Sequence, residues 1–477
     1  MKNASTHPVA SGVASPGRSD AAHVIVVGGG ISGLSAAHEL LASAPAGAVR
    51  VTVLEAERRL GGKIHTTPFA GRPGIDEGAD AFLTRVPGAL ELADKVGLGA
   101  ALVSPATGSA AVWWNGLQPI PSGLLLGLPT DVGPLARSKL LSWPAKLRAA
   151  SEIVRPRTST DSDSIGEWVR ARFGDQVHER LVDPLVGSIY AADTDRFSLA
   201  AVPQLAELAH GARSVLLASR RRPPAPTGPI FSSPAAGMGR LVETTARRIV
   251  ELGGTVVTDA ACTSMEPAGD GWLINGVAAD SVILACPAAQ AARLVLDAGT
   301  ADVFASIEYA DVVLITLAVP RSQLPERLRA MSGYLVPKPV QQLVTAVSFG
   351  SQKWPHWDTL SDGSAADTTV LRVSLGRDGL AVLHLSDEAL RDAALAEMRL
   401  HLDVELRPTD VRISRWPGAF PQYRPHHHRL VEQIEAQLPP SIALAGASYH
   451  GIGIPACVRS GARAAEMIGR LVQSGIR

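Results

Sequence analysis

A glycine-rich turn and one acidic residue are the first groups in the chain that could do recognisable chemistry. Residues 28–33 have the sequence Gly-Gly-Gly-Ile-Ser-Gly, which fits the pattern G-x-G-x-x-G, and Glu55 follows roughly 20 positions later. Such a turn lets backbone N–H groups approach a pyrophosphate, and an acid at this spacing accepts hydrogen bonds from ribose hydroxyls. The combination predicts a site for a dinucleotide, either FAD or NAD.

The elements expected around the turn support this interpretation. Residues 23–28 are a β-branched run that ends in glycines, residues 34–41 have apolar positions at helical spacing, and residues 49–55 predict a second strand. Strand, glycine turn, helix and strand form a βαβ unit, which is the context that the motif requires. The N-terminus of the helix would offer free N–H groups and a partial positive charge to the phosphates. An ordinary tight turn beside a solvated Glu55 is the structural alternative.

Composition excludes several other classes. The 477 residues carry 45 Lys+Arg and 45 Asp+Glu, so the formal net charge is +0, which argues against a nucleic-acid partner. Cys262, Cys286 and Cys457 lie far apart in the sequence, so we predict no metal site and no disulfide framework. Such cysteine usage suits a reducing compartment, and we expect a cytoplasmic protein.

The N-terminus and the longest uncharged run bear on membrane contact. Residues 1–22 are small and polar with no apolar secretion region, so they predict a disordered tail. No stretch is long and apolar enough for a transmembrane helix. The uncharged run 96–130 is interrupted by prolines and is either buried or lipid-facing. The sequence therefore predicts no transmembrane segment and leaves peripheral membrane contact open.

Several motifs carry a resemblance to a known family. The glycine turn, together with Leu-Glu-Ala-x-x-Arg-Leu-Gly-Gly-Lys at residues 54–63, resembles the FAD-binding opening of the amine-oxidase and protoporphyrinogen-oxidase superfamily. The resemblance extends over nearly the whole chain from residue 23 and is closest to the Gram-positive-type coproporphyrinogen III oxidases. Five further segments carry it: 75–83, 184–193, 237–241, 415–423 and 446–455.

The resemblance implies a fold and a division of the chain. It implies an α/β fold, α+β overall, in which a discontinuous Rossmann-like FAD domain is joined to a mixed-sheet substrate domain and a helical insertion. The α/β patterns at both ends of the chain agree with a discontinuous domain. The expected segments are 23–85, 230–298 and 411–477 for the FAD-binding domain, 86–220 for the largely helical insertion, 221–229 for a linker and 299–410 for the substrate domain.

The resemblance also implies an activity in haem biosynthesis. Coproporphyrinogen III would be oxidised to coproporphyrin III through FAD in three two-electron steps, with oxygen as acceptor and hydrogen peroxide formed. Cys457 lies outside any covalent flavin-attachment sequence, so the FAD is expected to be non-covalent. A ferrochelatase is a candidate recipient of the product. The alternatives are a protoporphyrinogen IX oxidase, a flavin amine oxidase, for which 4% aromatic residues is a low content, and a non-catalytic flavin-binding protein.

Carried over residue by residue, the resemblance implies a set of FAD contacts. Cys262 stands where the family usually has a valine, and Ala79-Asp80-Ala81 stands where Pro-Asp-Ser is common. The glycines before the last helix would also present N–H groups to negative charge on the flavin. The implied contacts are Gly28, Gly29, Gly30, Ile31, Ser32, Gly33, Glu55, Ala56, Lys63, Gly78, Ala79, Asp80, Ala81, Cys262, Trp416, Ile452, Gly453 and Ile454.

Three residues are candidates for contact with the substrate, while the catalytic residues stay unknown because the flavin carries the chemistry. Arg85 could pair with a substrate carboxylate, since a guanidinium matches a carboxylate bidentately. Tyr190 could line a pocket, and His427 aligns with a family histidine. For each residue a structural role is the alternative: a surface arginine, an aromatic packed in the core, and a buried histidine.

Overall fold

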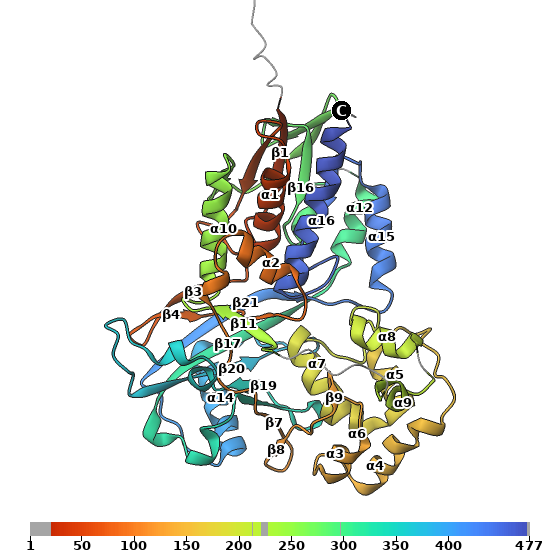
Figure 1. The fold of residues 1–477 in the computed structure, drawn as a ribbon, viewed down its shortest axis with the longest axis vertical. Coiled ribbons are helices and arrows are strands. Elements are labelled where there is room, and N and C mark those ends of the chain that lie inside the picture. The colour runs from red at the N-terminus through yellow and green to blue at the C-terminus, as the bar shows by residue number, and fades with distance from the viewer. Residues whose placement is uncertain (1–20, 212, 221–227, 296, 475–477) are drawn as a thin grey trace, which may run out of the picture.

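The computed structural model describes residues 21–211, 213–220, 228–295 and 297–474. Positions 1–20 of the predicted tail 1–22 lie outside the described residues. Positions 221–227 of the predicted linker 221–229 lie outside them too. Ala22 belongs to the first strand instead of the tail, because its backbone pairs with Val49. Figure 1 shows three regions: one around β1 and α1, one around a second, larger sheet, and one of short helices.

A five-stranded sheet forms the core of the first region. Its order is β12-β2-β1-β16-β22, and all of its described strand pairs are parallel. The central strand is buried at every position, as expected for a β-branched run in a parallel sheet that is covered on both faces. The strands are β1 (Ala22–Val27), β2 (Val49–Leu54), β12 (Thr255–Val257), β16 (Ser281–Leu284) and β22 (Ile442–Leu444).

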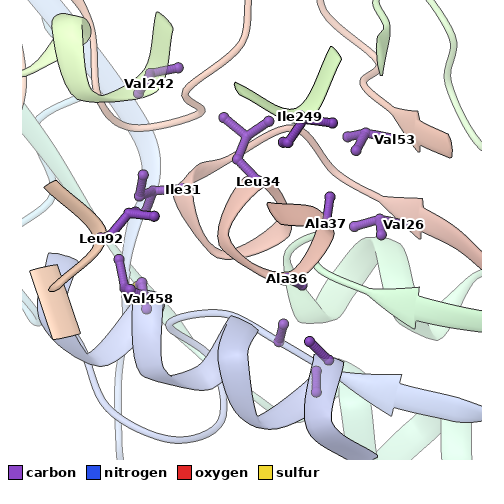
Figure 2. Close-up of a cluster of buried hydrophobic side chains, with 14 of the residues drawn as sticks. Val26, Ile31, Leu34, Ala36, Ala37, Val53, Leu92, Val242, Ile249 and Val458 are labelled. Atoms are coloured by element: carbon purple, nitrogen blue, oxygen red, sulfur yellow. The ribbon is translucent and has the colours of Figure 1, made fainter. Parts of the chain in front are cut away.

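Helices cover both faces of this sheet. Val24 and Val26 point into one hydrophobic cluster, while Ile25 and Val27 point into another on the opposite face. Figure 2 shows Leu34 of α1, Ile249 of α10 and Val26 of the sheet together in the first of these clusters. The first face carries α1 (Ile31–Ser43), α2 (Gly88–Lys95), α10 (Gly239–Glu251) and α16 (Ile454–Gln473). The second carries α11 (Ala288–Ala292), α12 (Ala298–Ala305), α15 (His427–Gln437) and the antiparallel strands β13 (Met265–Ala268), β14 (Gly271–Ile274) and β15 (Val277–Ala279).

A mixed seven-stranded sheet forms the second region, in the order β21-β17-β20-β19-β18-β7-β8. The pair β18 and β7 is parallel, and the other pairs are antiparallel. Helix α14 (Asp387–Leu402) contributes buried residues to its core. The strands are β7 (Ala110–Trp113), β8 (Leu117–Pro119), β17 (Tyr309–Pro320), β18 (Gly333–Leu335), β19 (Val344–Ser348), β20 (Thr368–Leu375) and β21 (Asp410–Pro421).

Two parts of the predicted division need correction. Strands β7 and β8 fall inside the segment 86–220 that was expected to be largely helical, yet they extend the seven-stranded sheet. Strand β21 begins the segment 411–477 that was assigned to the FAD-binding domain, yet it pairs with β17. Prolines within β21 argue against a strand, but at the edge of a sheet a missing N–H is tolerated. The remaining boundaries stay predictions.

The third region consists of short helices around one hydrophobic cluster. It contains a π-helical turn over residues 178–182, next to the N-terminus of α7. The helices are α3 (Val132–Arg137), α4 (Trp143–Ala150), α5 (Ile165–Phe173), α6 (Asp175–Val177), α7 (Asp183–Tyr190), α8 (Pro203–Gly211) and α9 (Val215–Ser219), and the short strands β9 (Leu124–Leu125) and β10 (Leu128–Pro129) pair beside them.

Small strands connect the regions. Strand β11 pairs with both β5 and β6, and β3 forms a hairpin with β4. These elements are β3 (Thr66–Phe69), β4 (Arg72–Asp76), β5 (Phe82–Leu83), β6 (Leu102–Val103), β11 (Phe231–Pro234) and the short helix α13 (Gly350–Lys353). The mixed α/β architecture agrees with the predicted fold class. No helix within the described ranges is both long and apolar enough to cross a membrane.

Candidate functional site

The glycine turn lies between β1 and α1, and its backbone geometry requires glycine at two positions. Gly28 has φ +115°, and a Cβ there would lie 2.8 Å from the carbonyl oxygen of Ala285. A Cβ at Gly33 would lie 2.0 Å from the oxygen of Gly28, so α1 could not pack this closely against the strand. A Cβ at Gly30 would meet nothing within 4 Å. The turn is therefore closed toward the protein and open at Gly30, as a bound pyrophosphate needs.

Helix α1 starts directly behind this opening. Its N-cap is Gly30, which has no side chain to cap the helix, and the N–H of Leu34 is the first to reach back to the Gly30 carbonyl, at 3.0 Å. The N–H groups of residues 31–33 precede that bond and point out of the helix end. They supply the donors and the partial positive charge that suit an anionic group.

Glu55 follows the end of β2 and reaches the same turn. Its Oε2 accepts a hydrogen bond from the N–H of Gly29 at 2.8 Å, and its Oε1 accepts one from Glu57 at 2.9 Å. A carboxylate has about four lone-pair positions, so about two remain for further donors such as ribose hydroxyls. The carboxylate is thus held at the glycine turn by two backbone N–H groups, with acceptor positions left for a ribose contact.

The second glycine pair lies against the first turn. The N–H of Gly61 donates to the carbonyl of Gly29 at 2.9 Å, so the backbone before Lys63 lines the same site. The Lys63 Nζ donates to the Gly418 carbonyl at 2.6 Å and lies 5.6 Å from the centre of the Tyr309 ring. Desolvation lowers the pKa of Lys63 to about 8.

Charged residues from the region around the seven-stranded sheet fix the position of the turn 78–81. Asp80 Oδ2 lies 3.0 Å from the Lys353 Nζ and 3.6 Å from the Arg372 guanidinium. It also accepts a hydrogen bond from the Trp354 indole N–H at 3.0 Å. Burial alone would raise the pKa of Asp80, but the two cations and the indole hold it well below its usual range. The Asp80 carboxylate is engaged by protein partners, which leaves the backbone of the turn and Ala79 and Ala81 as the parts open to a ligand.

Trp416 of β21 and the start of α16 are the remaining parts of the candidate site. The Trp416 indole donates to the Glu77 carbonyl at 2.9 Å, which places the ring beside the turn at Gly78. Helix α16 begins at Ile454, and Gly453 at φ +99° forms its N-cap. A Cβ at Gly453 would meet nothing within 4 Å, so the backbone at Ile452 and Gly453 is open to a ligand, as at Gly30.

Both helix N-termini lie at the carboxyl edge of the parallel sheet. The chain leaves β1 toward β2 on one side, while β16 pairs with β1 on the other side, so the strand order reverses between β1 and β16. Open α/β sheets bind dinucleotides at such a switch point. Cys262 lies near it, since the N–H of Ala260 donates to the Glu55 carbonyl at 2.8 Å. Burial raises the pKa of the Cys262 thiol.

Two of the three predicted substrate contacts belong to one row of stacked rings. Tyr190 stacks on Phe197 at a centroid distance of 5.1 Å, Phe197 on Tyr423 at 6.1 Å, and Tyr423 on His427 at 3.8 Å. Burial raises the pKa of Tyr190 and lowers that of His427 to about 4, so both are neutral at physiological pH. Arg85 lies outside this row. It is exposed in the loop after β5, and among the described residues it has no ion-pair partner.

Comparisons with known proteins identify the family of the chain that carries this site. The profile of the family described as flavin containing amine oxidoreductase matches residues 31–469. The chain belongs to that family. Coproporphyrinogen III oxidase of Mycobacterium tuberculosis is 35% identical over 464 residues, which cover 93% of this chain and 96% of that protein. The enzyme of the same name from Bacillus subtilis is 30% identical over 465 residues, covering 92% and 96%.

A solved structure supports the same relationship. A protein assigned as a protoporphyrinogen oxidase from Exiguobacterium sp. 255-15 superposes with a TM-score of 0.82 at 29% identity, covering 94% of this chain and 99% of that one. Cyclohexylamine oxidase of Brevibacterium oxydans shares the fold at 17% identity and a TM-score of 0.66. These likenesses confirm the resemblance inferred from the motifs.

The residues of this flavin-family chain fit the cofactor that the family description names. The open backbone at Gly30 and Gly453, the two uncapped helix starts and the half-satisfied Glu55 carboxylate are the features that a flavin dinucleotide requires. Within the described part of the chain, no cluster of three or more His, Cys, Asp or Glu side chains could hold a metal ion.

Sequence reasoning missed several residues of the site. Lys353, Trp354 and Arg372 contact Asp80 from more than 270 positions away, and neither they nor their neighbours form a motif. Tyr309 and Tyr423 were also missed, although Tyr423 closes one of the segments that carry the resemblance. The aromatic residue at the end of that segment was the one signal in the sequence for a ring partner of His427.

Proposed function

We propose that this protein is an oxygen-dependent coproporphyrinogen III oxidase that converts coproporphyrinogen III to coproporphyrin III through non-covalently bound FAD. The observation that carries the proposal is the open dinucleotide site between β1, Glu55 and α16. It occurs in a chain that relatives named coproporphyrinogen III oxidase match over more than nine-tenths of its length. Bound FAD supplies a two-electron acceptor that oxygen can reoxidise, with hydrogen peroxide formed.

The protein's own part is to hold the cofactor and the substrate. The N–H groups of residues 31–33 would receive the pyrophosphate, Glu55 the adenosine ribose, and the backbone of residues 78–81 and 452–454 the flavin ring system. The N-terminus of α16 would stabilise negative charge that develops on the flavin during reduction, because free N–H groups and the helix dipole favour an anion there. The buried thiol of Cys457 has a raised pKa, which suits packing and not attachment to a flavin.

The substrate side of the proposal rests on charge. Coproporphyrinogen III carries four propionates, and Arg85 is exposed, without an ion-pair partner in the described chain, next to the turn 78–81. We assign it a propionate. Loss of a hydride from a methylene bridge and of a proton from a pyrrole nitrogen removes two electrons, and three such rounds aromatise the ring. The location is proposed to be the cytoplasm and a ferrochelatase the recipient of the product.

The test compares coproporphyrinogen III and protoporphyrinogen IX under air, with porphyrin fluorescence and peroxide followed together and autoxidation blanks subtracted. The expected result is at least a tenfold preference in kcat/KM for coproporphyrinogen III, because cations placed for propionates stay unpaired when two of these become vinyls. Three peroxides should form per porphyrin. Equal or faster turnover of protoporphyrinogen IX would favour the second candidate, protoporphyrinogen oxidase, to whose Arabidopsis chloroplast representative the chain is 26% identical.

A further inference from the structure

The C-terminal turn of helix α7 places exposed side chains beside the candidate flavin site. Ser188 and Ile189 are exposed there, Ile189 by 44%. Ala191, directly after the helix, is buried in a small apolar cluster of β17 and β21, against which Trp416 packs. In Figure 1, α7 lies where the region of short helices meets the seven-stranded sheet. We call residues 188–192 the α7 end.

The backbone of the α7 end adopts a conformation that needs support from outside the helix. Ala191 has φ +46°, in the left-handed region that a residue with a Cβ adopts only where its surroundings hold it there. Two residues that follow strands of the seven-stranded sheet hold it. The N–H of Asp378 donates to the Ala191 carbonyl at 2.8 Å, and the side-chain amide of Gln422 donates to the Tyr190 carbonyl at 3.3 Å. The position of the α7 end is therefore set from the sheet.

Arg377, in the turn after β20, spans the whole length of α7. Its guanidinium donates two hydrogen bonds to the carboxylate of Asp183, the first residue of α7, at 2.7 and 2.9 Å. One nitrogen of the same group also donates to the carbonyl of Ala192, beyond the last residue of the helix. Between these contacts the guanidinium lies against Gly187, where an added Cβ would be 2.9 Å from it. One side chain from the sheet thus fixes both ends of α7.

The ion pair between Arg377 and Asp183 is buried. The exposed fraction is 7% for the Arg377 side chain and 0% for that of Asp183. Burial alone would raise the pKa of Asp183, but the hydrogen bonds and charge of Arg377 hold it below its usual range. Removing two charges from water costs free energy that offsets much of their attraction, whereas the bidentate geometry fixes the orientation of both partners. The pair therefore contributes more to the orientation of α7 than to stability.

We propose that Arg377 is a positioning residue, which holds the α7 end beside Trp416 so that this turn forms one wall of the porphyrinogen pocket. The identity of the substrate rests on the proposed function, whereas the hold on α7 does not depend on the activity. Because Arg377 is buried, it acts on the substrate only through the α7 end. Its loss should weaken substrate binding and leave FAD binding unchanged, because Glu55 and the glycine turn belong to the five-stranded sheet.

Arg377→Lys tests the proposal by steady-state kinetics. A lysine keeps a positive charge for Asp183 but has no planar fork, so it cannot hold Asp183 and the Ala192 carbonyl together. We expect KM for coproporphyrinogen III to rise about fivefold or more and kcat to change less than about twofold, the result of lost ground-state binding. The dissociation constant of FAD should stay the same.

Arg172→Lys is the matched control. Arg172 forms an equally buried pair with Glu152 in the same helical region, with exposed side-chain fractions of 3% and 0%. The pair does not contact α7, so the variant should lower the melting temperature without changing KM. If Arg377→Lys fails to fold, Asp183→Asn with Arg377→Gln removes both charges and leaves no unpaired one, and the same rise in KM is expected.

Hydrogen exchange of the FAD-loaded protein gives a readout that does not use the activity. The amides of residues 187–192 and of Asp378 should exchange about tenfold or more faster in Arg377→Lys than in the wild type, because their hydrogen bonds open more often. The amides of α1 should keep their rates in this variant. Arg172→Lys should leave exchange at the α7 end unchanged.

Unchanged exchange at the α7 end or an unchanged KM in Arg377→Lys would overturn the proposal. An equal rise of KM in Arg172→Lys would also overturn it, since any buried pair of the helical region would then have the same effect. A wild type that oxidises only protoporphyrinogen IX would overturn the substrate assignment alone, and KM for that substrate would be compared instead. A wild type that oxidises neither would refute the proposed function and the pocket wall with it, while the exchange rates would still decide whether Arg377 positions α7.

Discussion

The imidazole of His427 lies parallel to the ring of Tyr423, with the centroids 3.8 Å apart and the planes 13° apart. The His427 Nε2 donates to the Ser448 carbonyl at 2.9 Å. The Tyr423 hydroxyl donates to the Ala447 carbonyl at 2.6 Å and accepts from the N–H of Gly451 at 2.8 Å. Both rings therefore hold the loop between β22 and α16, and the structure favours a positioning role for His427, upstream of the uncapped start of α16.

This contact predicts a pH dependence of stability. Burial lowers the pKa of His427 to about 4, whereas an unfolded histidine has a pKa of about 6.5. The unfolded state then binds more protons between these values, so stability falls as the pH decreases from about 6.5 toward 4, by about 2 kcal/mol at pH 5. His427→Gln should reduce the loss of melting temperature between pH 7.5 and about pH 5. His401, whose pKa burial also lowers to about 4, retains its share of the loss. An unchanged pH profile in the variant would contradict the prediction.

Glu55→Gln should weaken FAD binding by about one to two decades. The glutamine amide keeps the shape of the carboxylate but loses its charge. Its NH₂ group would face one of the two backbone N–H groups, of Gly29 and Glu57, from which the carboxylate now accepts hydrogen bonds. Hydrogen bonds to a charged group contribute about 1.5–3 kcal/mol. Flavin fluorescence titration of the apoprotein measures the dissociation constant. Glu57→Gln is the control, because the Glu57 side chain pairs with Arg59 at 3.5 Å and should leave the constant unchanged.

FAD affinity should decrease as the pH rises through about 8. Desolvation lowers the pKa of Lys63 to about 8, so the amine that would face the anionic cofactor loses its charge above that pH. If binding requires the protonated amine, the dissociation constant should rise about tenfold between pH 7 and about pH 9. In Lys63→Met the constant should be higher at pH 7 and independent of pH. Lys95→Met removes a lysine that pairs with Glu39 away from the site, and the pH dependence should persist in it.

Asp80→Asn should lower the melting temperature strongly. The change leaves the Lys353 and Arg372 cations, whose side chains are 20% and 8% exposed, without their carboxylate. Removing one partner of a buried ion pair costs about 3–5 kcal/mol. Adding Lys353→Met removes one of the two stranded charges and should restore part of the stability. A double variant no more stable than Asp80→Asn alone would show that the charges are not the cause.

Arg85→Ala should reduce selectivity for coproporphyrinogen III. The exposed guanidinium is the proposed propionate partner, and a lost charge-assisted hydrogen bond costs about 1.5–3 kcal/mol, about tenfold or more in kcat/KM. Turnover of protoporphyrinogen IX should change less. Arg137→Ala, an exposed arginine of the helical region, is the control. If the ratio of the two kcat/KM values stays the same in Arg85→Ala, the role of Arg85 is refuted, while the substrate assignment stands.

The local parts of the site could be predicted from the sequence because their signals are local. Gly28, Gly30 and Gly33 are required by the backbone of one turn, and the β-branched runs on each side indicate β1 and β2 without reference to the rest of the chain. Glu55 lies at a spacing that the βαβ unit determines. The positions of the turn and of the two strands agree closely with the expectation, while the role of these residues in FAD binding stays a prediction.

The distant parts could not be predicted, because they depend on packing between regions. Asp80 and Lys353 are 273 positions apart, and nothing near either residue indicates the pair. Strand β7 has only four residues with no clear alternation, and its place in the seven-stranded sheet depends on pairing with β18. Strand β21 was assigned with the FAD-binding segment 411–477, and its pairing with β17 depends on contacts between distant parts of the chain.

The order of strands in the five-stranded sheet also has a consequence for how the chain is made. A ribosome releases β1 and β2 before the strands that complete the sheet. Strand β16, which pairs with β1, follows only after residue 280. Strand β22, which pairs with β16, follows only after residue 441. Until then the nascent chain carries at least one unpaired strand edge of a hydrophobic sheet, which is the kind of surface that chaperones shield. Since α16 and its open N-terminus follow β22 in the chain, the flavin site is completed only after the last strand of this sheet has been synthesised.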